Sequence, residues 1–202
     1  MATKATTLFS LAVVRAYIPI ESSNTKHDDA LTKIADGVSE RIESWTGRRF
    51  VTRNLTEYYE GRNRPNLQLR TFPVQSITTL KIRLTTSDTY VLVPAGDYDT
   101  DLRLGIVYLK NTVPGLSLDV FPNEFKAVEV VYSAGWAAQD ASGLPQDIYQ
   151  AGLEYIKFVY QRWQTGLIFA ASSNFSNMSI SIIPKPPADL QAVFDLYKQV
   201  RF

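Results

Sequence analysis

Residues 28–50, DDALTKIADGVSERIESWTGRRF, combine an amphipathic helix with an abrupt end and decide how the fold is built. Apolar side chains recur every three or four residues, which places them in one stripe along one helix face. Asp28 and Asp29 open the segment, where the helix dipole favours acidic groups, and Gly47 stands where a C-cap glycine ends a helix. The side chains that we expect in the core are Leu31, Ile34, Val38, Ile42, Trp45 and Phe50.

The composition is that of an ordinary globular protein and excludes several chemistries. The chain has 202 residues, 45% of them hydrophobic and 20% charged, which suits one domain with an appendage or two small domains. It has no cysteine and one histidine, His27, so a thiolate nucleophile or a zinc site of cysteines and histidines cannot form within one chain. Glycine motifs for phosphates and a nucleophile elbow are missing too. We therefore expect no catalytic residue, no cofactor and no metal, and a protein that is not an enzyme.

The charge and hydropathy of the chain limit the classes of partner that we expect it to bind. The 21 basic and 20 acidic residues nearly cancel, which argues against a generic nucleic-acid-binding domain. Apolar runs stay well below the roughly 18 residues that a membrane span needs. We expect a soluble protein, made in a cytoplasm, with no membrane partner.

After Phe50 the hydrophobic pattern changes from a helical period to alternation. Leu80 and Ile82 flank Lys81, and Val128 and Val130 repeat the pattern near the end of this region. Glycine, proline and asparagine clusters separate the alternating runs. Short strands joined by tight turns predict an antiparallel or mixed sheet over about residues 51–132.

A second long helix is predicted over residues 146–164, with Pro145 at a favourable starting position. It carries two apolar stripes, and one stripe suffices for packing on a sheet. We expect the second stripe to meet the first helix or a neighbouring subunit. The candidates for a subunit interface are Arg48, Arg49, Tyr149, Leu153, Ile156, Tyr160 and Trp163.

The chain changes character after Gly166. Pro184, Pro186 and Pro187 form a stiff spacer before a short amphipathic helix that we expect over residues 188–200. This helix either folds back on its own domain or binds a partner, and the sequence leaves both possibilities open. The predicted class is α+β, with two long helices packed with a small sheet. Residues 1–165 would form the core domain, and residues 166–202 a linker and a docking arm.

Arginines are concentrated between residues 48 and 70, with aromatic side chains between them. Single-strand nucleic-acid binders have this composition, but strand aromatics more often belong to a core and surface arginines are more often only solvated. Arg53, Arg62 and Arg64 are the candidates for non-specific contact with DNA.

Several short segments follow one another in a characteristic order: RAYI at 15–18, DDAL at 28–31, IESWTGRRF at 42–50, FPVQSI at 72–77, DYD at 97–99, GIV at 105–107, AG at 134–135 and LPQD at 144–147. In this order and spacing the chain resembles the head–tail connector (adaptor) proteins of tailed bacteriophages. The resemblance covers about residues 8–163 and is carried by the segments together, since each alone is short.

The resemblance implies an α+β subunit of a ring, usually of twelve copies, in the neck of a virion assembled in the host cytoplasm. Such a ring joins the portal to tail or neck proteins and surrounds the channel for the genomic DNA. Members often engage the portal through a C-terminal extension, and by position the docking candidates here are Leu190, Val193, Phe194, Tyr197 and Phe202. The alternatives are another neck or tail-completion protein, or a nucleic-acid-binding module that uses residues 48–70.

Overall fold

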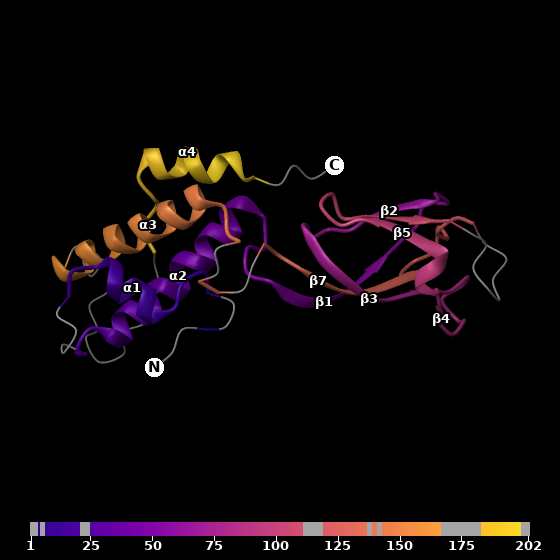
Figure 1. Cartoon of the computed structure of the whole chain (residues 1–202), viewed down its shortest axis with the longest axis horizontal. Coiled ribbons are helices and arrows are strands. Elements are labelled where there is room, and N and C mark those ends of the chain that lie inside the picture. The colour runs from indigo at the N-terminus through magenta and orange to yellow at the C-terminus, as the bar shows by residue number, and fades with distance from the viewer. Residues whose placement is uncertain are drawn as a thin grey trace. The chain divides into compact units, whose positions relative to one another are not determined.

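The chain forms an α+β structure of two compact units, which confirms the predicted class (Figure 1). The computed structural model describes residues 4, 7–20, 25–110, 119–136, 139–140, 143–166 and 183–198. Unit 1 comprises residues 1–51 and 137–202, and unit 2 comprises residues 52–136. The predicted boundary at residue 165, between a core domain and a docking arm, is a different division and stays a prediction.

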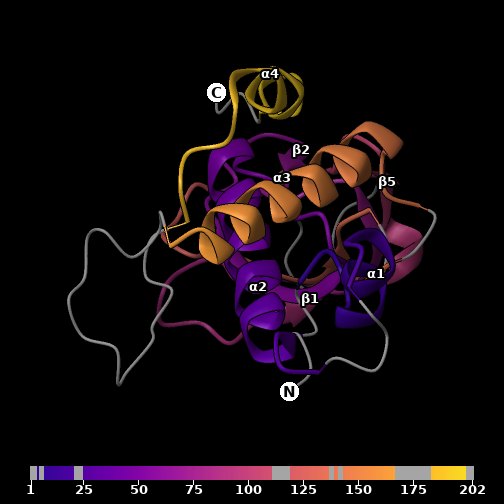
Figure 2. The same ribbon diagram turned by 90° about the vertical axis from the view of Figure 1, so that its left-hand side faces the viewer.

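Unit 1 is helical. The helices described in it are α1 (Leu11–Tyr17), α2 (Asp28–Thr46), α3 (Gln146–Gln164) and α4 (Ala188–Leu196). Helix α2 ends at Gly47, whose left-handed φ of 71° lets its N–H reach the Glu43 carbonyl at 2.9 Å. Figure 2 shows α3 crossing α2, with α1 beside them.

A glycine allows the close approach at the centre of unit 1. A Cβ at Gly152 of α3 would lie 2.6 Å from Cζ of Phe9, so a larger residue would have to displace a fully buried ring. The apolar stripe of α2 fills the surrounding core: Leu31, Ile34 and Val38 are fully buried. Phe50, just past the C-cap, is fully buried as well.

Unit 2 contains two antiparallel sheets. The first has the order β1 (Arg53–Tyr59), β7 (Val128–Ala134), β3 (Val74–Ile82), β4 (Val91–Leu92). The second has the order β2 (Asn66–Gln68), β6 (Ile106–Leu109), β5 (Tyr98–Asp101), with the short 3₁₀ helix η1 (Ala95–Asp97) before β5. All described strand pairs are antiparallel, so the mixed sheet that the sequence also allowed is not found among them.

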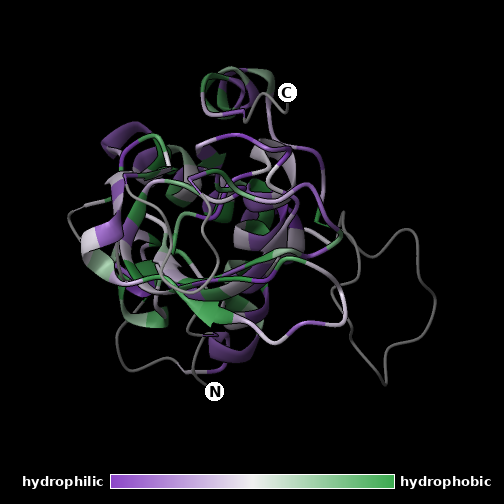
Figure 3. Ribbon diagram, turned by 90° about the vertical axis from the view of Figure 1, so that its right-hand side faces the viewer, coloured by the Kyte–Doolittle hydropathy of each residue, from purple (hydrophilic) through white to green (hydrophobic). Residues whose placement is uncertain are grey.

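Both sheets contribute to one core in unit 2. Val130 and Tyr132 of the central strand β7 are fully buried, and Leu80 of β3 lies opposite Val130. Val107 of β6 joins the same cluster from the second sheet. Figure 3 shows both hydrophobic and hydrophilic positions on the ribbon of this unit. Along β7, buried and half-buried positions alternate from Val128 to Ala134, as a sheet with one buried face requires.

A partly buried polar network lies at the edge of this apolar core and includes the buried Tyr59 and Tyr132. The hydroxyls of Tyr59 and Tyr132 both donate to the Glu57 carboxylate, at 2.6 Å for Tyr132. The same hydroxyls accept the backbone N–H groups of Arg70 and Thr71, at 3.0 and 3.3 Å. Burial raises the pKa of Tyr132 to about 12 and also raises the pKa of Tyr59, so both stay neutral donors. The network therefore fixes the loop after β2 to strands β1 and β7.

Gly61 gives a direct test of packing in unit 2. A Cβ at this position would overlap the Cβ and carbonyl group of Phe121, whose backbone is fixed by pairing with Arg64. Gly61→Ala is expected to lower the free energy of unfolding by about 3 kcal/mol, measured by urea denaturation. In the control, Gly96→Ala, a Cβ meets nothing within 4 Å, so its stability should change by less than about 0.5 kcal/mol. Equal midpoints for the two variants would contradict this packing.

Candidate assembly surfaces

Helix α4 lies on α2 and α3 within unit 1, so the predicted C-terminal helix is folded back on its own chain (Figures 1 and 2). Its one buried side chain is Phe194, which is 1% exposed and has its ring 6.1 Å from the ring of Tyr155. The Tyr155 hydroxyl donates to the carbonyl of Pro184, before α4 begins. The aromatic pair therefore anchors α4, and the Pro184 contact holds the segment that leads into it.

Polar contacts surround this anchor. The Trp45 indole N–H donates to Asp195 Oδ1 at 2.8 Å, and Arg48 Nε donates to the Tyr197 carbonyl at 2.6 Å. The Tyr197 hydroxyl lies 2.7 and 2.8 Å from the two carboxylate oxygens of Asp147, at the start of α3. The first two contacts join α4 and the residue after it to the C-terminal end of α2, and the third joins Tyr197 to the start of α3.

The electrostatics of the α4 contact follow from these pairs. Burial, and then the hydrogen bond to Asp147, raise the pKa of Tyr197 to about 12, so its hydroxyl is a neutral donor at ordinary pH. The hydrogen bond from Lys198, 2.6 Å away, lowers the pKa of Asp195, as does the one from Trp45. The ammonium groups of Lys185 and Lys198 lie 5.7 and 5.2 Å from the Trp45 ring, within cation–π range.

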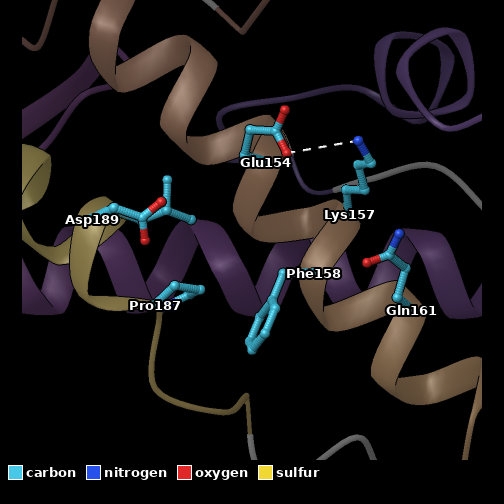
Figure 4. A pocket seen from close by; sticks show the side chains of 7 residues that line it. Glu154, Lys157, Phe158, Gln161, Pro187 and Asp189 are labelled. Atoms are coloured by element: carbon cyan, nitrogen blue, oxygen red, sulfur yellow. Dashed lines mark ion pairs between the residues drawn. The ribbon is translucent and has the colours of Figure 1, made fainter.

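A groove of about 340 Å³ runs between α3 and the start of α4 (Figure 4). Phe158 and Leu190 are apolar side chains of its lining. The charged side chains of the lining are Asp189 and the ion pair of Lys157 with Glu154, whose Nζ and Oε2 atoms are 3.8 Å apart. The full lining is Glu154, Lys157, Phe158, Gln161, Pro187, Asp189 and Leu190. The lining therefore combines apolar side chains with charged ones, as protein contact surfaces do.

The interface candidates on α3 divide into two groups. Leu153, Ile156 and Tyr160 are 4%, 1% and 3% exposed. Most of the second apolar stripe is therefore buried within unit 1. Tyr149 and Trp163 are only half-buried and retain exposed surface. Of the two predicted contacts for that stripe, the described chain shows the intramolecular one.

Arg48, Arg49 and Trp45 lie near the same end of α2. Arg48 is half-buried under the last turn of α4, and burial lowers its pKa. Arg49 is exposed and pairs with Glu43 at 2.7 Å. Trp45, which we expected in the core, is only half-buried, because its N–H must reach Asp195 and its ring face receives two lysines.

The candidates for portal docking differ in how far they are buried. Leu190, Val193 and Tyr197 are half-buried and Phe194 is buried, while Leu196, which the sequence analysis did not select, is 79% exposed. Phe202 lies outside the described residues.

The three arginines proposed for DNA contact do not lie together within unit 2. Arg53 begins β1, opposite Ala134, whereas Arg62 and Arg64 follow the other end of that strand. Arg62 and Asn63 have left-handed φ values of 56° and 52°, and the Asn63 side chain accepts the Asn123 N–H at 3.2 Å. Arg62 and Arg64 are thus held exposed on a fixed turn.

Near this turn lies a cluster of cations and aromatic rings that the sequence analysis missed. The Lys126 ammonium lies 5.2 Å from the Phe125 ring and 5.4 Å from the Tyr58 ring, and the Arg83 guanidinium lies 4.9 Å from Tyr90. Phe125 is 61% exposed. These residues come from three separate segments, so no local sequence pattern could have revealed the cluster.

Over the part of the chain that the structure describes, no group of three or more histidine, cysteine and acidic side chains could hold a metal ion. His27 lies edge-on to Tyr160 and Trp163, with ring centroids 6.0 and 5.5 Å away. Within the same residues, no helix combines the length and hydropathy of a membrane span.

A family model and several solved structures match this chain over nearly its whole length. The family model of the head completion protein (HCP) matches residues 7–200. Among solved structures, the neck of an empty gene transfer agent (GTA) particle computed with C6 symmetry contains a chain with a TM-score of 0.62 and 18% identity, covering 100% of this chain and 97% of that one. Chains from the virion of a native GTA particle and from a native GTA neck computed with C12 symmetry have TM-scores of 0.63 and 0.61 and identities of 18% and 19%, each with 100% and 94% coverage. No curated protein sequence matches significantly.

The hydroxyl of Tyr197 gives a test of how α4 is held. Tyr197→Phe keeps the ring and removes the bond to Asp147, which we expect to cost about 1 kcal/mol because both groups are partly exposed. Amide hydrogen exchange in α4 should accelerate several-fold while α2 and α3 stay protected. Tyr108→Phe, an exposed tyrosine of unit 2, is the matched control.

The same contact predicts a pH dependence. The pKa of Tyr197 is raised from 10.0 to about 12, so its contribution is complete below about pH 10 and is lost as the pH rises towards 12. The exchange difference between wild type and Tyr197→Phe should disappear over this interval. A constant difference across it would contradict the proposed role of the neutral hydroxyl.

Proposed function

We propose a function from one premise: the chain belongs to the head completion protein family. It is a structural protein of the virion neck, and we infer that it forms a ring there that joins the portal to tail or neck proteins around the DNA channel. The observation that carries this proposal is the family match over nearly the whole chain, and the full-length likeness to chains of GTA necks supports it. A non-enzymatic role fits the same family.

The ring is proposed to be a dodecamer with one repeated contact between subunits. The C6 and C12 symmetries of the GTA necks that contain similar chains support a number of copies divisible by six. A ring of identical subunits needs two different complementary surfaces on each copy. Tyr149, Trp163, Arg48 and Arg49 are our candidates, since each retains surface outside the core of unit 1.

The portal contact is proposed for the C-terminal segment, residues 184–202. Leu190 and Val193 form the half-buried flank of α4, and Leu196 adds an exposed apolar side chain one turn further along. Asp189 and Glu154 lie beside these apolar side chains. A hydrophobic centre with a charged periphery is typical of a protein-binding surface.

A pair of neighbouring substitutions tests this contact. Val193→Glu places a charge in the apolar flank of α4, whereas Ala192→Glu places the same charge at an exposed position of the same helix turn. We expect Val193→Glu to weaken binding of the full chain to the portal encoded with it at least tenfold, measured by a titrated pull-down, because a buried unpaired carboxylate is costly. Ala192→Glu should bind as wild type does. Equal binding of both variants would refute portal docking by α4.

Contact with the passing DNA is proposed to be weak and non-specific. Arg62 and Arg64 are exposed on the fixed turn after β1, and neither has an ion-pair partner among the described residues. With 21 basic and 20 acidic residues, the chain as a whole offers little net attraction to phosphates, which suits a wall past which DNA slides.

Salt dependence tests the DNA contact. If both arginines meet phosphates, replacing both with alanine should reduce the slope of log K against log salt for duplex binding to the assembled ring by about 2. Arg103→Ala, at an exposed arginine of the β5–β6 turn, is the control for the loss of one general charge. An unchanged slope in the double variant would remove Arg62 and Arg64 from the channel wall.

A further inference from the structure

We propose that neighbouring copies of this chain meet through unit 2, where the outer surface of one sheet packs on the outer surface of the other sheet in the next copy. The surface on the sheet β1–β7–β3–β4, which we call face 1, comprises Tyr58, Arg83, Leu92, Phe125 and Lys126. The surface on the sheet β2–β6–β5, which we call face 2, comprises Asp99, Asp101, Leu102, Leu104 and Tyr108. The inference rests on the proposed ring and adds unit 2 to the candidates for its subunit contact.

Exposed apolar side chains are concentrated in unit 2. Among the described residues, Leu196 is the only exposed large hydrophobic side chain that belongs to unit 1. The others have exposed fractions of 37 to 61% and are Tyr58, Leu84, Leu92, Leu102, Leu104, Tyr108 and Phe125. Apolar patches that stay exposed on a folded protein mark surfaces that another molecule covers.

Face 1 lies on the outside of its sheet. Val130 is buried in the core, so its neighbour Glu129 points to the other side of the sheet. The strand register places three residues in one row with Glu129, namely Tyr58, Lys81 and Leu92. Exposed apolar surface therefore lies at both ends of this row.

Two cations lie beside the aromatic end of face 1. The Lys126 ammonium is within cation–π range of both Tyr58 and Phe125. The Arg83 guanidinium donates to three carbonyl groups, 2.9 to 3.2 Å away, which fix its position but do not neutralise its charge. Within the part of the chain that the structure describes, neither cation forms an ion pair. Face 1 is therefore suited to a partner that brings carboxylates next to apolar side chains.

Face 2 has this composition. Val107 is buried in the core, so Tyr108 next to it points outward, opposite Asp99. The turn after β5 adds Leu102 and Leu104, both exposed. Apolar side chains and an acidic residue thus share the outer surface of the second sheet.

The carboxylates of face 2 can accept further hydrogen bonds. Asp101 Oδ1 accepts the Leu104 N–H at 2.9 Å, and Asp101 has no ion-pair partner among the described residues. Asp99 pairs with Lys110 at 2.7 Å, but both side chains are exposed, and such pairs are weak in water. With Arg103 also exposed in this turn, the attraction that we propose acts between individual groups in contact and not through a uniformly negative surface.

The two faces complement each other, whereas neither complements itself. Face 1 against a second face 1 would bring uncompensated cations together, which is unfavourable. The inner sides of both sheets share one core, and Figure 1 shows β2 and β5 in one layer of unit 2 and β1, β3 and β7 in the other. Two different complementary surfaces on opposite sides of a subunit make a head-to-tail contact, which repeats from copy to copy around a ring.

The first experiment joins neighbouring copies covalently, and the absence of cysteine from the chain leaves no competing thiol in it. Necks are purified from particles assembled with full-length variants, in which Phe125→Cys marks face 1 and Leu104→Cys marks face 2. With a bis-maleimide, the double variant should give a ladder of joined copies, because every copy carries both halves of the contact. Each single variant should stay monomeric.

Three results would overturn this contact. The double variant stays monomeric, a single variant forms dimers with itself, or a single variant is joined to a different neck protein. The last result would assign that face to the other protein and not to a second copy of this chain.

The second experiment places a charge on each face. Phe125→Glu and Leu104→Glu should each reduce the number of chain copies retained in purified necks at least tenfold, because each buries an unpaired carboxylate in the contact. Ala95→Glu, at an exposed position of unit 2 outside both faces, is the control and should assemble as wild type does. Thermal unfolding of the free chains should be alike for all three variants, since the substituted side chains are exposed. Normal assembly of both face variants would overturn the contact.

Failure of this contact and failure of the proposed function are distinguishable. If images of the necks show a ring of this chain but no ladder forms, the ring uses another contact and the pairing of face 1 with face 2 is wrong. If the chain forms no ring in the necks, the proposed function itself is wrong.

Discussion

The pairing of β1 with β7 is the constraint on which the rest of the structure depends. Arg53 lies opposite Ala134, so the first and last strands of unit 2 run side by side and the chain leaves unit 2 next to where it entered. Residues 52–136 are therefore an insertion between two helices of one helical unit. Because the insertion closes on itself, α2 and α3 can pack together although about a hundred residues separate them.

The helices were predictable from the sequence because their information is local. The apolar period and Gly47 define α2, and Pro145 marks the start of α3, where the structure has these elements. The alternation of β7 likewise agrees with its buried and exposed positions. Strand order is not local. The paired residues of β1 and β7 lie about 70 to 80 positions apart in the chain, and β3 has register shifts that no turn residue predicts.

The candidate surfaces were harder to predict, since they depend on tertiary contacts. Trp45 belongs to the apolar stripe by position, but its indole N–H needs a partner, and Asp195 supplies it from 150 residues away. The Asp147–Tyr197 contact has no sequence signature at all, because an acidic residue in the first turn of a helix is common. The arginines that are neighbours in sequence lie at opposite ends of β1, where the period of a strand cannot bring them together.

The fixed turn after β1 has a consequence for the energetics of any contact made there. Gly61 N–H is bonded to the Pro122 carbonyl at 2.7 Å and Phe121 N–H to the Arg64 carbonyl at 2.8 Å, so the backbone that carries Arg62 and Arg64 is already ordered. A charged ligand that meets this turn would immobilise only two side chains, at roughly 0.5–1.5 kcal/mol each, and no loop. Such a contact has little conformational entropy to lose on association or to regain on release. It can thus form and break repeatedly as a polyanion moves past, without a rearrangement of the protein that would slow either step.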